Sequence, residues 1–342
     1  MGYSKIAALA ACLFVFVCGV AQSSQAAKLD QIKTRGFLQC GINGLLPGFS
    51  TPDDQGNFSG LDVDYCRALA AAVFGDASSA KFTPLTAKER FTALQSGEID
   101  ILSRNTTWIL SRDASQGINF VGVTYYDGQG IMVKKDLGVS SVKELDGATI
   151  CINQGTTNEL NLADFFRANG LKFTAITFEK PDEVVAAYAK GRCDAYTSDR
   201  SQLAAQRIKL TNQSDHVILP DVLSKEPLGP AVQHGDDQWF DIAKWVYYVL
   251  LNAEELGVTS KNVDEMRANS KNADVQRMLG AQGKLGEMLG LPADFGYQII
   301  KQVGNYGEIF ERNLGPNTPI GLERGVNALW SQDGLQYAPP LR

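Results

Sequence analysis

Two stretches of this 342-residue chain share one pattern, and that pattern decides the fold. Residues 93–103 read ALQSGEIDILS, and residues 187–197 read AYAKGRCDAYT. Each reads as the end of a helix, a glycine stop, an aspartate, a short strand and a hydroxyl residue. The two stretches are 94 residues apart, about the size of one small lobe. The repeat therefore predicts two lobes of similar design.

Strands and helices alternate on either side of these stretches. Strands are expected at 36–43, 81–85, 99–102, 131–134, 149–152, 173–178 and 193–197. Helices are expected at 62–74, with Asp62 as cap and Gly75 as stop, and at 87–96, 157–169, 182–190 and 201–210. After residues 231–233 the pattern becomes mostly helical, over 239–256, 263–270, 273–279 and 297–314. The alternation predicts an α/β fold with parallel sheets covered on both faces.

The first 27 residues read as an export signal. Lys5 is the only charged residue among them, and residues 6–20 form an apolar run followed by small and polar residues. This is the order of regions in a secretory signal, with cleavage expected near Ala26 or Ala27. A membrane-spanning helix needs about 20 apolar residues, more than this run contains. Lipidation at Cys12 is not expected, because the apolar run continues beyond it.

The net charge and the length of the chain limit the classes of protein to which it can belong. The chain has 32 Lys and Arg against 38 Asp and Glu, a formal net charge of −6. Removal of residues 1–27, with Lys5, leaves 315 residues at −7. A nucleic-acid-binding protein usually presents a basic face, so no nucleic-acid partner is expected. This length suits two lobes of roughly 150 residues each. No other apolar stretch is long enough to span a bilayer.

Four cysteines remain after removal of the signal: Cys40, Cys66, Cys151 and Cys193. An even number in an exported protein indicates two disulfides, and four cysteines allow three pairings. The sequential pairing, Cys40–Cys66 and Cys151–Cys193, closes short loops and keeps each pair in its own half of the chain. A zinc site is the alternative, but no C-x-x-C spacing occurs and His216 and His234 are the only histidines, so no metal is expected.

Motifs for catalysis are missing from the sequence. It contains no G-x-S-x-G elbow, no P-loop and no H-E-x-x-H. The two histidines lie in no recognisable catalytic setting, and both are expected in loops. A binding protein without catalytic residues or cofactor is therefore the leading interpretation.

Candidate ligand-binding groups follow the two repeated strands. Ligands of open parallel sheets bind beyond the carboxyl ends of the strands, which is where Ser103 and Thr197 lie. Residues 103–113 read SRNTTWILSRD, and Arg112 within them can hold a carboxylate through two parallel hydrogen bonds. A solvated loop arginine is the structural alternative.

Two further segments complete the candidate site. Residues 154–159, QGTTNE, open a helix in which Thr156 and Glu159 fit a capping box, although a helix start also binds anions. Asp199 can cap the helix after the second repeated strand, or can accept hydrogen bonds from an ammonium. Together these groups offer one anion site and one cation site, which matches an α-amino acid.

These residues resemble a known family. Residues 60–70, GLDVDYCRALA, resemble the signature of the family 3 periplasmic solute-binding proteins of polar amino-acid ABC transporters. Arg112, residues 154–158 and residues 191–199 occur in that family's order and spacing. Residues 103–112 and 161–169, with the paired cysteines, are closest to the general L-amino-acid-binding branch. The resemblance covers essentially the whole chain after the signal.

The resemblance implies a two-lobed clamshell with a two-strand hinge. Its expected boundaries are residues 28–126 plus 229–342 for one lobe and 127–228 for the other. It implies that the ligand carboxylate meets Arg112, Thr156 and Thr157. The ligand ammonium would meet Asp199, with help from Ser103 and Thr106, and Asn105 is included with this loop. Leu46 stands at the position where many relatives place an aromatic ring over the ligand. The absence of that ring would fit a broad ligand specificity.

The implied function is capture of L-amino acids in the periplasm and delivery to an inner-membrane ABC permease, by a monomer. Two alternatives remain open. Periplasmic dehydratases of the same fold act on small carboxylic acids, so the fold does not decide between binding and catalysis. A sensor ectodomain is the other alternative.

Overall fold

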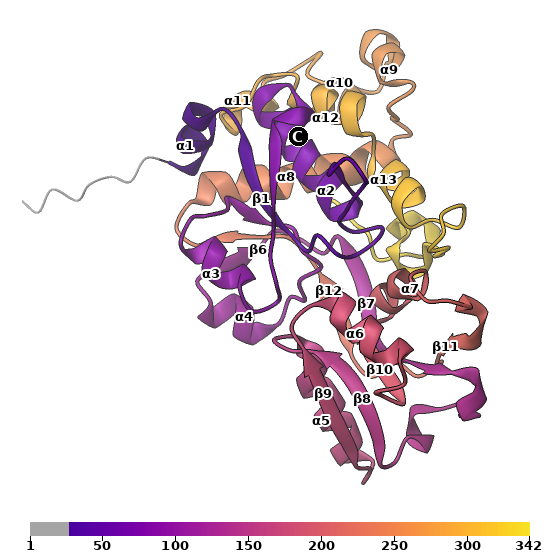
Figure 1. The fold of residues 1–342 in the computed structure, drawn as a ribbon. Helices are drawn as coiled ribbons and strands as arrows, with labels where there is room; N and C mark the ends of the chain where they lie inside the picture. The colour runs from indigo at the N-terminus through magenta and orange to yellow at the C-terminus, as the bar shows by residue number, and fades with distance from the viewer. Residues whose placement is uncertain (1–26) are drawn as a thin grey trace, which may run out of the picture.

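The computed structural model describes residues 27–342, which form two large sheets with helices around each (Figure 1). The predicted signal peptide lies outside the described residues, apart from Ala27. Within residues 27–342, the sheet of the first lobe has the order β4 (Ala80–Pro84), β1 (Leu38–Ile42), β5 (Ile101–Leu102), β13 (Ala231–Gln233), β6 (Ile118–Phe120). The sheet of the second lobe has the order β11 (His216–Ile218), β7 (Tyr125–Lys134), β10 (Ala195–Asp199), β8 (Ala148–Asn153), β9 (Phe173–Phe178).

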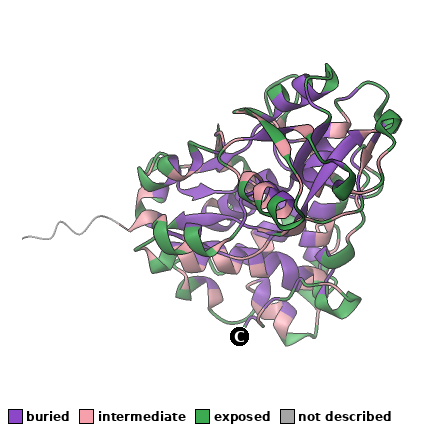
Figure 2. Ribbon diagram, turned by 90° about the horizontal axis from the view of Figure 1, so that it is seen from below, coloured by how far each residue is buried: buried purple, intermediate pink, exposed green. Residues whose placement is uncertain are grey.

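Most helices surround the first lobe. They are α1 (Lys28–Arg35), α2 (Leu61–Phe74), α3 (Arg90–Gln95), α4 (Leu110–Ser115), α8 (Asp237–Glu255), α9 (Val263–Asn269), α10 (Ala273–Met278), α11 (Leu285–Met288), α12 (Phe295–Val303) and α13 (Tyr306–Asn313). A short hairpin, β2 (Thr51–Pro52) with β3 (Phe58–Ser59), precedes α2. Figure 2 shows the buried residues gathered along the sheets and the inner faces of these helices. No helix within residues 27–342 has the length and apolarity needed to cross a bilayer.

The second lobe is covered on both faces because its strands alternate two apolar sets. Ile131 and Val133 of β7 pack with α5 (Thr157–Ala168), whereas Met132 between them packs with α6 (Pro181–Ala189) and α7 (Arg200–Arg207). Successive side chains of a strand point to opposite faces, so this continuous apolar run fits a strand with helices on both sides.

The repeated stretches do form equivalent units. In each, a helix (α3 or α6) is followed by a glycine with positive φ, Gly97 at +76° and Gly191 at +71°. The next aspartate accepts a backbone N–H from the neighbouring strand: Asp100 Oδ2 from Gln39 at 2.8 Å, and Asp194 Oδ2 from Thr149 at 2.7 Å. In each lobe, the aspartate of the repeated stretch thus ties two adjacent strands together.

The sheets are mixed, whereas parallel sheets were predicted. β13 runs antiparallel to β5 and β6, and β7 runs antiparallel to β10 and β11. The reason is the route of the chain, since β7 carries the chain into the second lobe and β13 follows its return through β12, so that both enter their sheets from the opposite direction. Strand β7 begins with Tyr125, six residues before the predicted strand at 131–134.

The lobes are joined by β7 and β12 (Lys225–Leu228), which pair antiparallel from Tyr125 opposite Leu228 to Gly128 opposite Lys225. The two-strand connection expected from the sequence is therefore present, and the clamshell architecture is confirmed. The boundaries at 126/127 and 228/229, taken as limits of two bodies that move against each other, stay a prediction.

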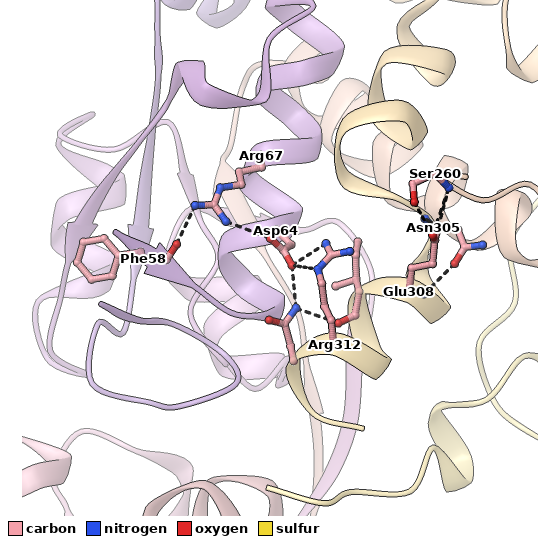
Figure 3. Close-up of polar contacts among 9 residues, drawn as sticks. Phe58, Asp64, Arg67, Ser260, Asn305, Glu308 and Arg312 are labelled. Atoms are coloured by element: carbon pink, nitrogen blue, oxygen red, sulfur yellow. Dashed lines mark hydrogen bonds and ion pairs between the residues drawn. The ribbon is translucent and has the colours of Figure 1, made fainter. Parts of the chain in front are cut away.

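The predicted helix over 297–314 is two helices. Helix α12 ends before Gly304, and Asn305 begins α13 with a capping box, its side chain accepting from Glu308 N at 2.9 Å while Glu308 accepts from Asn305 N at 2.9 Å. Helix α13 is fastened to α2 by the buried carboxylate of Asp64, which accepts from Arg312 and Asn313, with Arg67 beside it (Figure 3). The C-terminal helices are therefore part of the first lobe.

Both predicted disulfides are present, and the sequential pairing is confirmed. Cys40 of β1 joins Cys66 of α2 in the first lobe, and Cys151 of β8 joins Cys193, just before β10, in the second. Each bond lies within one lobe, so neither restrains movement between the lobes.

Candidate functional site

A cavity lies between the lobes, where the carboxyl ends of β5, β8 and β10 face one another. Its free volume in this structure is small, about 20 Å³. The lining residues are Asn43, Ala87, Arg90, Arg104, Asn105, Thr107, Arg112, Asn153, Thr156, Thr157, Asn158, Glu179, Pro181, Asp199 and Gln202. Strand ends are the usual ligand position in open α/β sheets, and both lobes contribute.

Arg112 supplies a buried cation from the first lobe. It lies in α4, is only 8% exposed, and its Nη1 donates to the carbonyl of Thr107 at 2.9 Å. Burial lowers the pKa of its guanidinium, while the carboxylates of Glu226 and Asp199 act against that shift. An arginine stays charged even so, and its remaining N–H donors suit a carboxylate in the cavity.

The loop that follows β5 and contains Ser103 and Asn105 is held in place by the side chain of Asp62. Its carboxylate accepts from Asn105 N at 2.9 Å and from Ser103 Oγ at 3.3 Å. Asp62 does not cap its own helix as predicted, because α2 begins at Leu61 with Gly60 at the cap position. Burial raises the pKa of Asp62 to about 7, against the lowering effect of these two hydrogen bonds.

This raised pKa predicts a pH-dependent stability. The folded state binds the Asp62 proton more tightly than the unfolded chain, so the group's contribution is full below about pH 4 and lost as the pH rises to about 7. Asp62→Asn keeps an acceptor for Asn105 and should raise the free energy of unfolding, relative to the parent, by up to about 4 kcal/mol at pH 8 but little at pH 4.

Urea unfolding at both pH values measures this difference. Asp54→Asn, at an exposed position, is the matched control and should leave the pH profile unchanged. If the free energy of unfolding falls equally between pH 4 and pH 8 in the parent and in Asp62→Asn, Asp62 is not the titrating group.

The second lobe contributes the start of α5. The predicted capping box is wrong: Thr156 stands at the cap position, but its hydroxyl donates to Asn153 O at 2.7 Å, and Glu159 accepts from Gly155 N at 2.6 Å. The side chain of Thr156 therefore does not cap the first turn of α5. Backbone N–H groups at such an end, with the helix dipole, attract an anion.

Glu226 of the hinge strand β12 links the two walls of the cavity. Its Oε2 accepts from Thr107 Oγ1 at 2.6 Å in the first lobe and from Thr157 Oγ1 at 2.8 Å in the second. Its Oε1 accepts from Asn161 at 2.7 Å and from Ser224 at 2.6 Å. The Thr157 hydroxyl is thus engaged with Glu226 and Thr107, and the backbone N–H groups at the start of α5 are the donors that face an anion.

Asp199 supplies the opposite charge. It stands at the cap position of α7 without capping it, and its Oδ1 accepts from Asn158 Nδ2 at 3.0 Å. Burial raises the pKa of this carboxyl well above its usual value, and the neighbouring carboxylates of Asp127 and Glu226 raise it further. An ammonium beside Asp199 would favour its charged form, so the site has a place for a cation.

The structure brings together most of the predicted site residues. Asn105, Arg112, Thr156, Thr157 and Asp199 all line the cavity. Ser103, Thr106 and Leu46 do not: Ser103 donates to Asp62, Thr106 donates to Arg104 O at 2.7 Å, and Leu46 is fully buried in the first-lobe core.

Several lining residues were not predicted. Thr107, Arg104 and Asn158 lie inside the segments singled out in the sequence, next to predicted residues, so only their side-chain directions were missing. Arg90, Asn153 and Gln202 lie in α3, at the end of β8 and in α7, and no motif marks them.

The lobes touch across the cavity, as in a closed clamshell. Asn105 Nδ2 donates to Gln202 Oε1 at 3.2 Å, and Lys209 Nζ donates to Leu45 O at 2.8 Å. The apolar core of the first lobe also continues onto Ala204 and Ala205 of α7. Within residues 27–342, no three His, Cys, Asp or Glu residues gather so that they could hold a metal ion.

Two α/β lobes closed over a cavity with a buried cation and a buried carboxylate define a solute-binding protein of the periplasmic-binding-protein fold. The chain belongs to family 3 of the bacterial extracellular solute-binding proteins, whose family model matches residues 38–276.

Relatives are similar over nearly the whole chain. It is 56% identical over 321 residues to the putative amino-acid ABC transporter-binding protein YhdW of Escherichia coli K12, covering 94% of each chain. It is 55% identical over 323 residues to the general L-amino acid-binding periplasmic protein AapJ of Rhizobium johnstonii, covering 94% and 95%. A solved ABC transporter periplasmic binding protein from Brucella ovis with glutathione bound is 55% identical, with a TM-score of 0.91, covering 93% of this chain and 100% of that one.

Proposed function

We propose that this protein captures L-α-amino acids in the periplasm and delivers them to an inner-membrane ABC permease. Export by a cleaved signal at residues 1–27 and action as a monomer, without cofactor or catalysis, are parts of the proposal. The names of YhdW and AapJ support the proposal. The solved relative with glutathione supports it too, because the γ-glutamyl end of glutathione carries free α-amino and α-carboxyl groups.

The observation that carries the proposal is the pair of opposite charges on the cavity wall, Arg112 at 8% and Asp199 at 5% exposure. Burying a charged group is costly unless an opposite charge lies against it, and a zwitterion in the cavity would place one against each of these two side chains. The α-carboxylate would lie against Arg112 and the first turn of α5, and the α-ammonium against Asp199. Ser103 and Thr106, which do not line the cavity, would position the loop.

Binding would also close the lobes. Arg112 belongs to the first lobe and Asp199 to the second, so a ligand held by both bridges them only in the closed state. A ligand shifts a conformational equilibrium only through such differential affinity. The movement is assigned to the hinge of β7 and β12, with lobes at 28–126 plus 229–342 and at 127–228, by the hinge mechanism of domain closure.

A thermal-shift screen of the mature protein against the twenty L-amino acids tests this function. A ligand at 100 times its Kd should add about 2.7 kcal/mol to the stability of the protein. We expect several amino acids to raise Tm and their D-enantiomers to have no effect. A complete lack of response among the L-amino acids would refute the proposal.

One observation favours a second candidate function. A buried carboxyl with a raised pKa, such as Asp199, is also what a general acid requires. A dehydratase-like enzyme acting on a small carboxylic acid is therefore the alternative. Incubation with prephenate or arogenate, followed by chromatography, separates the two, since product formation would favour the enzyme.

A further inference from the structure

The end of the chain packs against the strand that leads from the first lobe into the second. Residues 324–336, the hinge brace, lie beyond residues 38–276, the part of the chain that matches the family model. The hinge brace includes the helical turn η5 (Gly325–Asn327) and two buried amide side chains, those of Asn327 and Gln336. Because buried polar groups are nearly always hydrogen-bonded, the partners of these two amides show what the hinge brace holds.

Asn327 takes the place of a neighbouring strand beside Tyr126 of β7. Its Oδ1 accepts from Tyr126 N at 2.7 Å, and its Nδ2 donates to Tyr126 O at 3.0 Å. In the pairing with β12, Tyr126 lies opposite Pro227, and a proline has no N–H to donate. One side-chain amide therefore satisfies both backbone groups of Tyr126, which a strand edge would otherwise leave unpaired.

The hinge brace is itself fastened to the first lobe. Arg324 forms two hydrogen bonds with the carboxylate of Glu254 in α8, at 3.0 and 3.2 Å. It also donates from Nε and Nη2 to the backbone carbonyl of Asn327. Gln336 Nε2 donates to Val123 O, just before β7, at 3.2 Å. The chain is thus held to the first lobe up to the point where it crosses.

The next residue of β7 is bound to the second lobe instead. The carboxylate of Asp127 accepts from the backbone N–H of Ser201, in α7, at 3.2 Å, and from the Ser201 hydroxyl. Tyr126 and Asp127 are neighbours in the chain, yet their hydrogen bonds outside the hinge go to different lobes. The first crossing between the lobes therefore falls at the peptide bond that joins them.

Strand β12 changes lobes at the same level. Trp108 N of the first lobe donates to Pro227 O at 2.8 Å, whereas Glu226 accepts from Asn161 of α5 at 2.7 Å. The bond that Glu226 accepts from Thr107 is the one that opening of the lobes would break. Pro227 and Glu226 lie opposite the two residues of β7 at which the chain changes lobes, so the two crossings are side by side.

We propose that Asn327 is a positioning residue for lobe closure. By holding Tyr126 to the first lobe, it confines the pivot to one peptide bond on each strand, 126–127 and 226–227. The second of these lies two residues before the expected boundary at 228/229. The ligand-free lobes then sample few orientations, so closure costs little conformational entropy. The hinge brace thereby raises the affinity for every ligand without touching any of them. This inference rests on the lobe movement of the proposed function.

Asn327→Ala removes both hydrogen bonds to Tyr126 and frees the strand before the pivot. We expect calorimetry to show about tenfold weaker binding of L-glutamate and of L-alanine alike, as for one residue whose backbone is released in the open state. Nitroxide labels at two exposed positions, Glu98→Cys in the first lobe and Lys172→Cys in the second, measure the distance between the lobes. The variant should give a broader distance distribution without ligand, and the parent distribution with ligand.

Asn317→Ala, at an exposed position of the same C-terminal region, is the matched control and should change neither measurement. Arg324→Met frees the backbone of Asn327 but keeps its amide, so it should give a smaller change of the same kind. This second variant decides the matter if Asn327→Ala does not fold.

A folded Asn327→Ala with parent-like affinities and an unchanged ligand-free distance distribution would overturn the inference. Weaker binding of only one of the two amino acids would overturn it as well, because Asn327 would then act on the ligand's side chain. If the parent binds neither amino acid, the proposed function is what fails. A broader ligand-free distribution in Asn327→Ala would still support the pivot in that case.

Discussion

Replacement of Arg112 by alanine is expected to weaken the binding of every L-amino acid by about 100-fold to 1,000-fold, whatever the side chain. Truncating one partner of a buried, hydrogen-bonded charge pair costs about 2–5 kcal/mol. The ligand carboxylate would lose its fork of donors and remain buried, and lysine offers only a point charge in its place. Arg112→Lys should therefore recover only part of the affinity.

The fold should survive this change. Within residues 27–342 the side chain of Arg112 makes one hydrogen bond, to the carbonyl of Thr107, and it lies at the cavity instead of in an apolar core. Calorimetry with L-glutamate and L-alanine, beside urea unfolding, measures both effects. Arg167→Ala, at an exposed i,i+3 ion pair, is the control that should change neither. Parent-like affinity in Arg112→Ala would remove Arg112 from the site.

Removal of the disulfides is expected to have the largest effect on stability. The bonds close loops with sequence separations of 26 and 42 residues. In the chain-entropy model, loops of this size correspond to about 3.5 kcal/mol for Cys40–Cys66 and about 4 kcal/mol for Cys151–Cys193. All four cysteines are buried in apolar clusters, so the paired Cys→Ala variants avoid placing a new polar group in the core.

Urea unfolding of the two double variants measures these losses. Because each bond lies within one lobe, variants that remain folded should bind amino acids with parent-like affinity. Thiol counting on the unfolded parent should find no free cysteine. A free thiol in the mature protein, or a loss below about 1 kcal/mol, would contradict the assigned role.

Much of the fold could be predicted because local signals agreed with the final structure. Strand β9 has the predicted bounds, and Gly75, Gly97 and Gly191 end their helices as expected. The crossing strand β7 was only half predicted. Its first residues include Asp127 and Gly128, which are poor strand formers, and the pairing with β12 is what holds them extended.

The site was harder to predict, because it depends on side-chain directions that a sequence does not specify. Arg112 and Asp199 follow the repeated strands, so the rule for strand ends locates them. Arg90 lies on a short helix with no motif, and only the packing of α3 turns it into the cavity. Thr106 and Thr107 are adjacent hydroxyl residues, and only the backbone of the loop decides that Thr107 is the one that lines the cavity.

The most direct test of the account is calorimetric titration of the mature protein with L-glutamate and with two analogues that each lack one head-group charge. N-acetyl-L-glutamate removes the ammonium that Asp199 would hold, and L-isoglutamine removes the α-carboxylate that Arg112 would hold. The account predicts one glutamate per chain and at least about 100-fold weaker binding of each analogue, as for loss of a buried charged partner. Binding of either analogue as tightly as L-glutamate would contradict it.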